Sequence, residues 1–211
     1  MYLPKQFEVS DLGEISRFVT EVGAADLVTV DEIGTPIATL MPCVWRTTNQ
    51  SYGTLVMHMA RGNNQWKSIS SNGKSLAIVH GPQAYISPSN YEAKKTDHRV
   101  VPTWNYQSVH FTGKVEVSED VELLRKIVTE LTDAHESSRE VPWKVAQSAP
   151  TYFEAQLKGI VAVILHIERV EAKYKLSQNR SIEDQKNVIS DLENSFKNND
   201  RDIANEMKRN I

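Results

Sequence analysis

Residues 58–66, HMARGNNQW, gather the polar groups with the clearest chemical potential in the chain. The pattern predicts a strand that enters a short helix through polar residues, with Asn63 as the cap of that helix. Backbone N–H groups, side-chain amides and the guanidinium of Arg61 would then lie together, which suits a phosphate. An ordinary connection between a strand and a helix is the alternative, and the residues alone favour it.

Two further clusters suit the same kind of ligand. Residues 175–180, KLSQNR, hold two cations and three hydrogen-bonding side chains after a strand, which suits a phosphate or the polar edge of a ring. Residues 101–106, VPTWNY, put aromatic faces beside an amide, which suits stacking on a flat ligand. A solvated strand end and half-buried strand aromatics are the respective alternatives.

Other chemistry has little support in the sequence. The six histidines lack metal-binding spacing, so no metal site is predicted, and a structural role is the usual one for strand residues such as His110 and His166. Cys43 is the single cysteine, and its apolar neighbours favour a buried, inert thiol. The motifs of serine hydrolases, P-loop proteins and dinucleotide-binding proteins are missing, and no catalytic residue is predicted.

Caps and hydrophobic periodicity mark the expected elements. Asp11 and Glu14 predict a first helix that Gly23 ends. Ser118 is the expected cap of a second helix, and Ser181 opens the last one. Strands are expected over residues 27–30, 36–45, 53–59, 74–80, 84–89, 103–117, 160–169 and 173–176. Other expected features are a turn over 47–51, a short helix from Asn63 to 72–73, loops over 92–102 and 137–150, and a frayed polar tail from Lys197.

These elements favour a mainly β fold with flanking helices. Helices do not alternate with the strands, so an antiparallel barrel with helices outside fits better than a doubly wound parallel sheet. The 211 residues, of which 40% are hydrophobic, favour one large domain over the alternative of two small ones. The net charge of −3 argues against an extended nucleic-acid surface. The first residues lack the order of a signal peptide, and the longest apolar run, residues 160–165, is too short for a membrane span. We therefore expect a cytoplasmic protein without membrane contact.

Five segments together resemble a known family. They are MYLPKQF at the start, HMARGNNQW, GPQAYISPSNY, VPTWNY with His110 soon after it, and KLSQNRSIEDQKNVI. In their order and spacing they resemble the PaiB-type proteins, which are described as FMN-binding negative transcriptional regulators. The resemblance covers about residues 1–193.

The resemblance implies an FMN-binding split β-barrel over residues 1–180, followed by a C-terminal helix and polar tail over residues 181–211. Pyridoxamine-phosphate oxidases and flavin reductases share that fold, and such proteins form homodimers with FMN at the subunit interface. A homodimer and a small planar ligand are therefore the expected partners. The implied residues are His58, Arg61, Asn63, Asn64 and Gln65 near the phosphate, Trp104 and Asn105 beside the ring, and Lys175, Gln178 and Asn179 from the second subunit.

The chain departs from the family pattern at four positions. Leu40 and Gln83 stand where histidine is expected, and Asn64 and Asn90 stand where proline and tryptophan are expected. Three functions therefore stay open: a flavin-binding regulator, an FMN-dependent oxidoreductase or haem-binding or haem-degrading protein on the same fold, and a dimer whose site has decayed and holds no cofactor. Direct DNA binding has little support, because the sequence has no helix-turn-helix pattern and no basic stripe.

Overall fold

The computed structural model describes residues 1–48, 51–69, 73–96 and 98–211. Its contacts divide the chain into two compact units. Unit 1 comprises Met1–Asp11, His80–Val109 and Glu171–Ile211, and unit 2 comprises Leu12–Val79 and His110–Val170. The units follow contacts rather than chain order, and the division into residues 1–180 and 181–211 stays a prediction.

Eight strands in the described part of the chain form one mainly antiparallel sheet. They are β1 Glu8–Val9, β2 Ala24–Val30, β3 Pro36–Pro42, β4 Val44–Arg46, β5 Thr54–Ala60, β6 Ser75–Ile86, β7 Thr103–Ser118 and β8 Ile160–Lys175. The strand order is β3-β2-β6-β7-β8-β5-β4, with β1 beside β8. Only Cys43 separates β3 from β4, the strands at the two ends of this order, so the sheet curls round on itself in unit 2. The prediction of a mainly β fold with flanking helices is confirmed.

Local signals predict some of the helices, and the structure adds others that the sequence does not predict. The helices are α1 Leu12–Val22, α2 Ala93–Thr96, α3 Val121–Glu136, α4 Pro150–Leu157, α5 Ile182–Glu193 and α6 Asn198–Lys208, with short 3-10 turns η1 Lys5–Phe7, η2 Asn64–Lys67, η3 Pro88–Asn90 and η4 Val145–Gln147. Those that local signals predict are α1, η2, α3 and α5. The predicted cap Asn63 accepts the N–H of Gln65 at 3.0 Å, and Ser181 accepts that of Asp184 at 3.1 Å. Each bond satisfies a backbone donor that the first helical turn leaves unpaired.

Strand β5 lies within the apolar core of unit 2. On one of its faces Leu55 and Met57 are fully buried. On the other face Val56 packs in a cluster that includes Leu124 of α3 and Leu157 of α4. Because side chains alternate along a strand, this pattern shows that β5 is covered on both faces.

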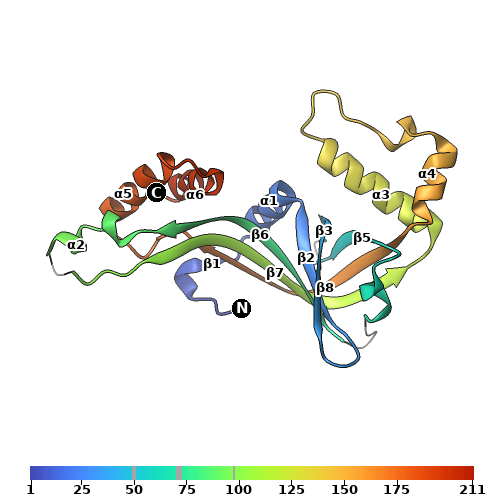
Figure 1. The fold of residues 1–211 in the computed structure, drawn as a ribbon, viewed down its shortest axis with the longest axis horizontal. Coiled ribbons are helices and arrows are strands. Elements are labelled where there is room, and N and C mark those ends of the chain that lie inside the picture. The colour runs from blue at the N-terminus through green and yellow to red at the C-terminus, as the bar shows by residue number, and fades with distance from the viewer. Residues whose placement is uncertain (49–50, 70–72, 97) are drawn as a thin grey trace. The chain divides into compact units, whose positions relative to one another are not determined.

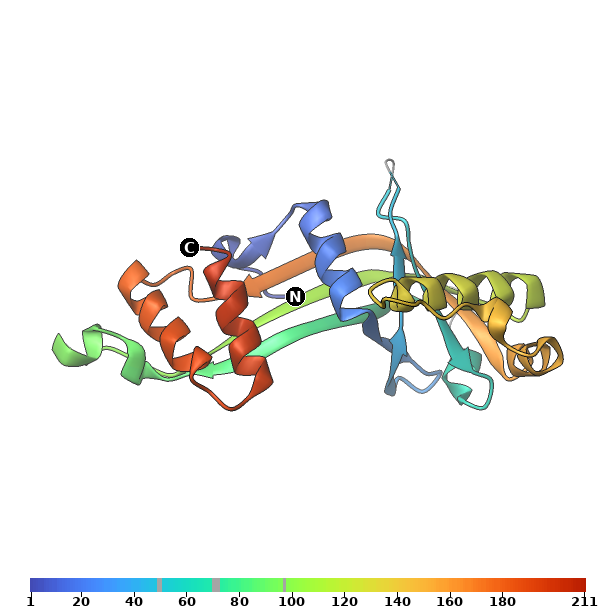
Figure 2. The same cartoon turned by 90° about the horizontal axis from the view of Figure 1, so that it is seen from above.

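In unit 1 the strands β6, β7 and β8 have helices on one face and the N-terminal segment on the other. Figure 1 and Figure 2 show α5 and α6 over these strands, with η1 on the opposite side. Asn105 of β7 donates to Sδ of Met207 on α6, at 3.5 Å. The ammonium of Lys175 lies 5.9 Å from the centre of the Phe7 ring in η1. The two faces of this part of the sheet therefore meet different partners.

The prediction of a frayed tail from Lys197 is wrong. Residues from Asn198 onwards form α6, which packs against α5. Ile203, Ala204 and Met207 are buried, and their spacing puts them on one face of the helix. Only these three residues form the apolar face of α6, and the polar residues around them make the helical periodicity hard to recognise in the sequence.

Strand β6 is continuous through Pro82, where the sequence predicts a break. Strand β2 pairs with Leu76 to Ile78 of β6, and Pro82 lies beyond this pairing. The lack of a backbone N–H at Pro82 therefore costs no hydrogen bond to β2. The predicted cap of α3 is also wrong. Asp120 caps that helix, whereas Ser118 accepts the N–H of Asp120 at 3.2 Å.

Two of the predicted loops contain helices. The short helix α2 lies within residues 92–102, while η4 and the start of α4 lie within residues 137–150. The predicted turn over residues 47–51 and the continuation of the short helix to residues 72–73 include positions outside the described residues. None of the described helices is both long enough and apolar enough to cross a membrane.

Substitution of Gly23 by alanine is expected to destabilise unit 2. Gly23 has a φ of +68°, and a Cβ there would come within 2.6 Å of Cε1 of His135. We expect the free energy of unfolding of Gly23→Ala, measured by urea titration, to fall by roughly 1–3 kcal/mol. Gly62→Ala is the matched control, because a Cβ there meets no atom within 4 Å. An equal loss in both variants would contradict this assignment of strain.

Candidate functional site

Arg61, the predicted phosphate residue, follows β5 in unit 2 and is engaged within the chain. Its Nη1 donates to Oε1 of Glu119 at 2.7 Å, and its Nε donates to the carbonyl of Lys158 at 2.8 Å. Its Nη2 donates to the carbonyl of Ile160 at 3.4 Å. The side chain is 38% exposed, so the ion pair is a surface pair, which usually contributes little to stability. A phosphate could reach Arg61, but it would have to compete with Glu119.

Gln65 is the most firmly held residue of this segment, with 2% of its surface exposed. Its Nε2 lies 3.0 Å from the carbonyl of Leu27, 3.0 Å from Oγ1 of Thr29 and 3.1 Å from the carbonyl of Ile37. Its Oε1 accepts the hydroxyl of Thr39 at 2.5 Å. The amide therefore ties η2 to β2 and β3, and a contact between Gln65 and a ligand stays a prediction.

The two neighbouring asparagines differ in their surroundings. Nδ2 of Asn63 donates to Oγ1 of Thr39 at 3.0 Å, in addition to the capping bond. Asn64 is exposed. Of the two, Asn64 has the side chain that a ligand in solution can reach without breaking a bond inside the unit.

His58 lies under helix α3 in unit 2. It stands opposite Ala162 of β8, and it shares the face of β5 that carries Val56, which packs against the helices. Nδ1 of His58 is buried without a hydrogen-bond partner in the described part of the chain. Burial lowers the pKa of His58 below its ordinary value of 6.5, so the neutral form predominates near neutral pH.

In unit 1 the structure brings together two of the segments that the sequence singles out. The ammonium of Lys175 donates to Oγ1 of Thr103 at 2.6 Å and to the carbonyl of Trp104 at 2.7 Å. Nδ2 of Asn105 donates to Oγ of Ser177 at 2.9 Å. The start of β7 and the end of β8 are thus adjacent within one chain, although about 70 residues separate them in sequence.

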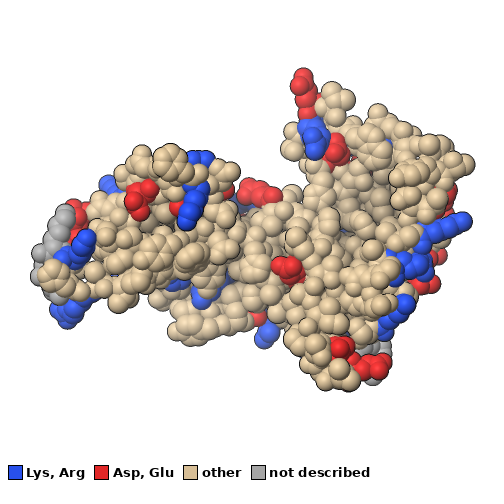
Figure 3. Space-filling view, in the orientation of Figure 1, with Lys and Arg blue, Asp and Glu red and all other residues tan. Residues whose placement is uncertain are grey.

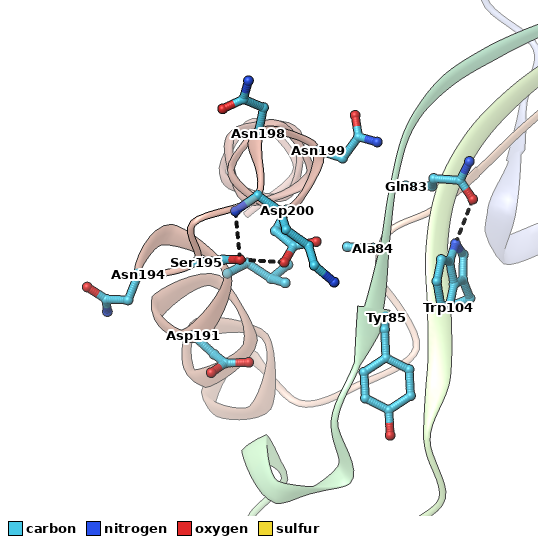
Figure 4. Close-up of a pocket in the computed structure, with 12 residues that line it drawn as sticks. Gln83, Ala84, Tyr85, Trp104, Asp191, Asn194, Ser195, Asn198, Asn199 and Asp200 are labelled. Carbon is cyan, nitrogen blue, oxygen red and sulfur yellow. Dashed lines mark hydrogen bonds between the residues drawn. The ribbon is translucent and has the colours of Figure 1, made fainter.

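Trp104 presents an aromatic surface, which we call the Trp104 patch and define as Gln83, Tyr85 and Trp104. Trp104 is 46% exposed and Tyr85 is 51% exposed, and their ring centres lie 6.2 Å apart with an interplanar angle of 65°. The indole N–H of Trp104 donates to Oε1 of Gln83 at 3.0 Å, as Figure 4 shows. Asn105, the next residue, donates to Met207 of α6, so the side chains of Trp104 and Asn105 leave β7 on opposite faces. This exposed, oriented ring can stack on a flat ligand.

Sequence reasoning finds Trp104 by its type but assigns no role to Gln83 or Tyr85. Gln83 is noted only as a departure from the family pattern, and its partner lies 21 residues further along the chain. Tyr85 could be found from the alternation along β6, where Ala84 and Ile86 are buried while Gln83 and Tyr85 are exposed. A cross-strand hydrogen bond leaves no comparable signal in the sequence.

The other predicted residues of unit 1 serve its internal structure. Asn105 is fully buried. Oε1 of Gln178 accepts the N–H of Leu176 at 2.7 Å, and its Nε2 donates to the carbonyl of Tyr174 at 2.5 Å. Asn179 is exposed. Asn105 and Gln178 therefore shape the turn that follows β8, and Asn179 is the predicted residue there that solvent reaches.

A cleft of about 820 Å³ runs between β6 and the connection from α5 to α6, all within unit 1 (Figure 4). The strand side is formed by Gln83, Ala84, Tyr85 and Trp104, and the helix side by Asp191, Leu192, Asn194, Ser195 and residues 197–200. The volume is in the range of small-molecule sites. In the described part of the chain no group of three or more potential metal ligands comes together.

Comparisons with known sequences find close relatives. Residues 1–169 match a family model described as "Putative FMN-binding domain". The chain is 38% identical over 208 residues to "Protease synthase and sporulation protein PAI 2" of Bacillus subtilis, with 99% of this chain and 97% of that protein covered. It is 31% identical over 181 residues to an uncharacterized protein of Emericella nidulans, with 74% of this chain and 72% of that protein covered.

Solved structures with a similar fold include two from bacteria. The FAD and heme binding protein from Mycobacterium smegmatis has a TM-score of 0.58 at 15% identity, with 80% of this chain and 73% of that chain covered. The flavocytochrome Anf3 from Azotobacter vinelandii has a TM-score of 0.56 at 12% identity, with 80% and 69% covered. At such identities the likeness shows the fold alone.

The buried imidazole of His58 should make stability depend on pH. The pKa of His58 is lower in the folded state than in the unfolded chain, so the unfolded chain binds the proton more readily. The folded state is therefore favoured above pH 6.5, the ordinary pKa of histidine, and this contribution to the free energy of unfolding is lost as the pH falls below that value. Between about pH 7.5 and pH 5.5, we expect His58→Met to lose less free energy of unfolding than the wild type. The exposed His80 supplies the control variant His80→Met. Equal losses in the wild type and His58→Met would show that the imidazole is not protonated on unfolding.

Proposed function

The chain belongs to the FMN-binding domain family, and from this premise we propose that it binds FMN with the isoalloxazine ring against the exposed face of Trp104. The single observation that carries the proposal is the Trp104 patch, in which Gln83 accepts the indole N–H and Trp104 stays 46% exposed. Bound flavin supplies electron and hydride transfer. The residues of the patch would position a flat ligand.

The groups around the patch suit the chemistry of a flavin. An isoalloxazine has a broad aromatic face, which the indole can cover, and an edge of hydrogen-bonding atoms. The ammonium of Lys175 is bonded to the carbonyl of Trp104, so a cation lies beside the stacking surface. Such a cation favours the negative charge that reduced flavin carries. Asn179 is exposed in the turn that follows β8 and would offer an amide to the ring edge.

We further propose that the chain acts as a flavin-binding regulator, as its resemblance to PaiB-type proteins implies. Direct DNA contact is not part of this proposal. The net charge is −3, and on the face drawn in Figure 3 basic and acidic side chains of the described residues are interspersed. The net negative charge supports an indirect effect on transcription.

The homodimer is likewise a proposal. Exposed aromatic rings such as Trp104 and Tyr85 are typical of surfaces that a partner or ligand covers. The expected mass is twice that of one chain in analytical ultracentrifugation, and addition of FMN should not dissociate the dimer. If a monomer binds FMN tightly, the proposed site does not need a second subunit.

The absorption spectrum of the purified protein separates flavin from haem. We expect flavin bands after incubation with FMN and removal of free ligand, and no shift of the Soret band when haem is added, because Gln83 stands in the patch where the family resemblance leads us to expect histidine. A shifted and sharpened Soret band would favour the haem alternative. Bleaching of flavin bands by NAD(P)H would indicate an oxidoreductase.

Removal of the indole should weaken flavin binding. We expect Trp104→Ala to lose roughly 1–3 kcal/mol of FMN binding free energy, the range found for aromatic stacking on a base. Trp104→Phe should keep most of the affinity, and Tyr152→Ala, which removes an exposed ring on α4, is the matched control. Fluorescence quenching of FMN measures each affinity. If Trp104→Ala binds as well as the wild type, the ring does not lie on this patch.

A further inference from the structure

The cleft of unit 1 has two walls of different chemistry. Its strand side carries the rings of Tyr85 and Trp104, and its helix side carries the carboxylates of Asp191 and Asp200 (Figure 4). We propose that this cleft binds an organic cation, with an alkylammonium group held between the rings and the carboxylates. Such a site is additional to the proposed flavin site and needs no bound flavin.

The two carboxylates on the helix side are held by neutral partners. Oδ2 of Asp191 accepts a hydrogen bond from Nδ2 of Asn90 at 3.0 Å. Oδ2 of Asp200 accepts the hydroxyl of Ser195 at 2.6 Å, and the neighbouring Arg201 donates to the carbonyl of Ser195 at 2.9 Å. Within the described residues, neither carboxylate has a Lys or Arg nitrogen at ion-pair distance, so both negative charges are open to a cation from solution.

The rings on the strand side suit the same ligand group. The ring centres of Tyr85 and Trp104 lie 6.2 Å apart at an interplanar angle of 65°, so the two rings form a corner rather than a parallel stack. The π face of an aromatic ring attracts an ammonium, and the indole of tryptophan does so best. Because both side chains are exposed, a cation can reach this corner from solution.

Two departures from the family pattern hold the walls of this cleft. Gln83, where histidine is expected, accepts the indole N–H of Trp104 at 3.0 Å on the aromatic wall. Asn90, where tryptophan is expected, donates to Asp191 on the charged wall. The lining residues of the helix side also lie beyond residues 1–169, which match the family model. The cleft is therefore a feature of this chain for which the flavin-binding motifs do not account.

The charge and size of the cleft define the class of ligand. A phosphate on the helix side would approach two carboxylates, whereas an ammonium gains from both of them. Among the described lining residues the basic one is Lys197, which is exposed, so it opposes a cation only weakly. A cleft of about 820 Å³ is larger than an ammonium group. We therefore expect the natural ligand to carry its charge on a larger skeleton.

Choline serves as a probe for the charged end of the ligand. Its matched control is the uncharged carbon isostere, in which a tert-butyl group replaces the trimethylammonium. Saturation-transfer NMR of the methyl signals measures the binding of each compound to the wild type without flavin. We expect choline to bind about tenfold more tightly than the isostere, because only choline gains from the rings and the carboxylates as a cation.

Charge-neutral variants test the helix side. Asp191→Asn and Asp200→Asn remove one negative charge each and keep an oxygen that can accept the existing hydrogen bond. Each should weaken choline binding about threefold or more and change the binding of the isostere little. Asp202→Asn removes a carboxylate of α6 that does not line the cleft and serves as the control. Circular dichroism confirms that each variant is folded.

Substitutions of Tyr85 test the strand side in the same titration. Tyr85→Leu should reduce the preference for choline over the isostere, whereas Tyr85→Phe keeps an aromatic face and should retain it. Equal binding of the two compounds by the wild type, no saturation transfer to choline, or choline binding unchanged in both Asp191→Asn and Asp200→Asn overturns the proposal. Because these titrations contain no flavin, a failure of the protein to bind FMN would count against the proposed function and leave the cation site standing.

Discussion

The structure of unit 1 depends on how the ammonium groups at the end of β8 are stabilised. A cation that loses water must regain hydrogen bonds or an opposite charge. Lys175 regains two hydrogen bonds, which it donates to Oγ1 of Thr103 and to the carbonyl of Trp104. These bonds join the end of β8 to the start of β7 and so fix the backbone that carries the exposed indole. Because both acceptors are neutral, the same bonds that order the strand ends leave the charge available to a ligand.

The hydrogen bond between Gln83 and Trp104 explains how the patch can persist although the chain departs from the family pattern. A glutamine amide and a neutral imidazole both offer an acceptor to an indole N–H. Glutamine at position 83, where the family resemblance leads us to expect histidine, would therefore keep the orientation of the ring. It removes a side chain that could ligate iron or transfer a proton. The departure is thus more compatible with a stacked flavin than with a ligated haem.

The sequence predicts features that depend on near neighbours and misses those that depend on distant ones. The caps Asn63 and Ser181 act on N–H groups two and three residues away, and both are confirmed. Gln65 bonds to groups 26 to 38 residues away, so its type alone could not distinguish a buried structural amide from one that contacts a phosphate. Helix α6 is missed because its buried face consists of Ile203, Ala204 and Met207 in an otherwise polar segment.

A motif that a family shares can mark packing as well as binding, and the physical placement of each side chain separates the two. In HMARGNNQW, Gln65 and Asn63 use their amides to hold η2 against β2 and β3, and Arg61 is paired with Glu119. In VPTWNY and KLSQNR, the indole is exposed and the ammonium keeps a donor. Rigid elements position binding groups best when the polar atoms that build the frame are satisfied within it. After β5 in unit 2, the polar side chains are used within the frame itself. In unit 1 the frame is also satisfied, but an ammonium and an exposed indole remain accessible to a ligand.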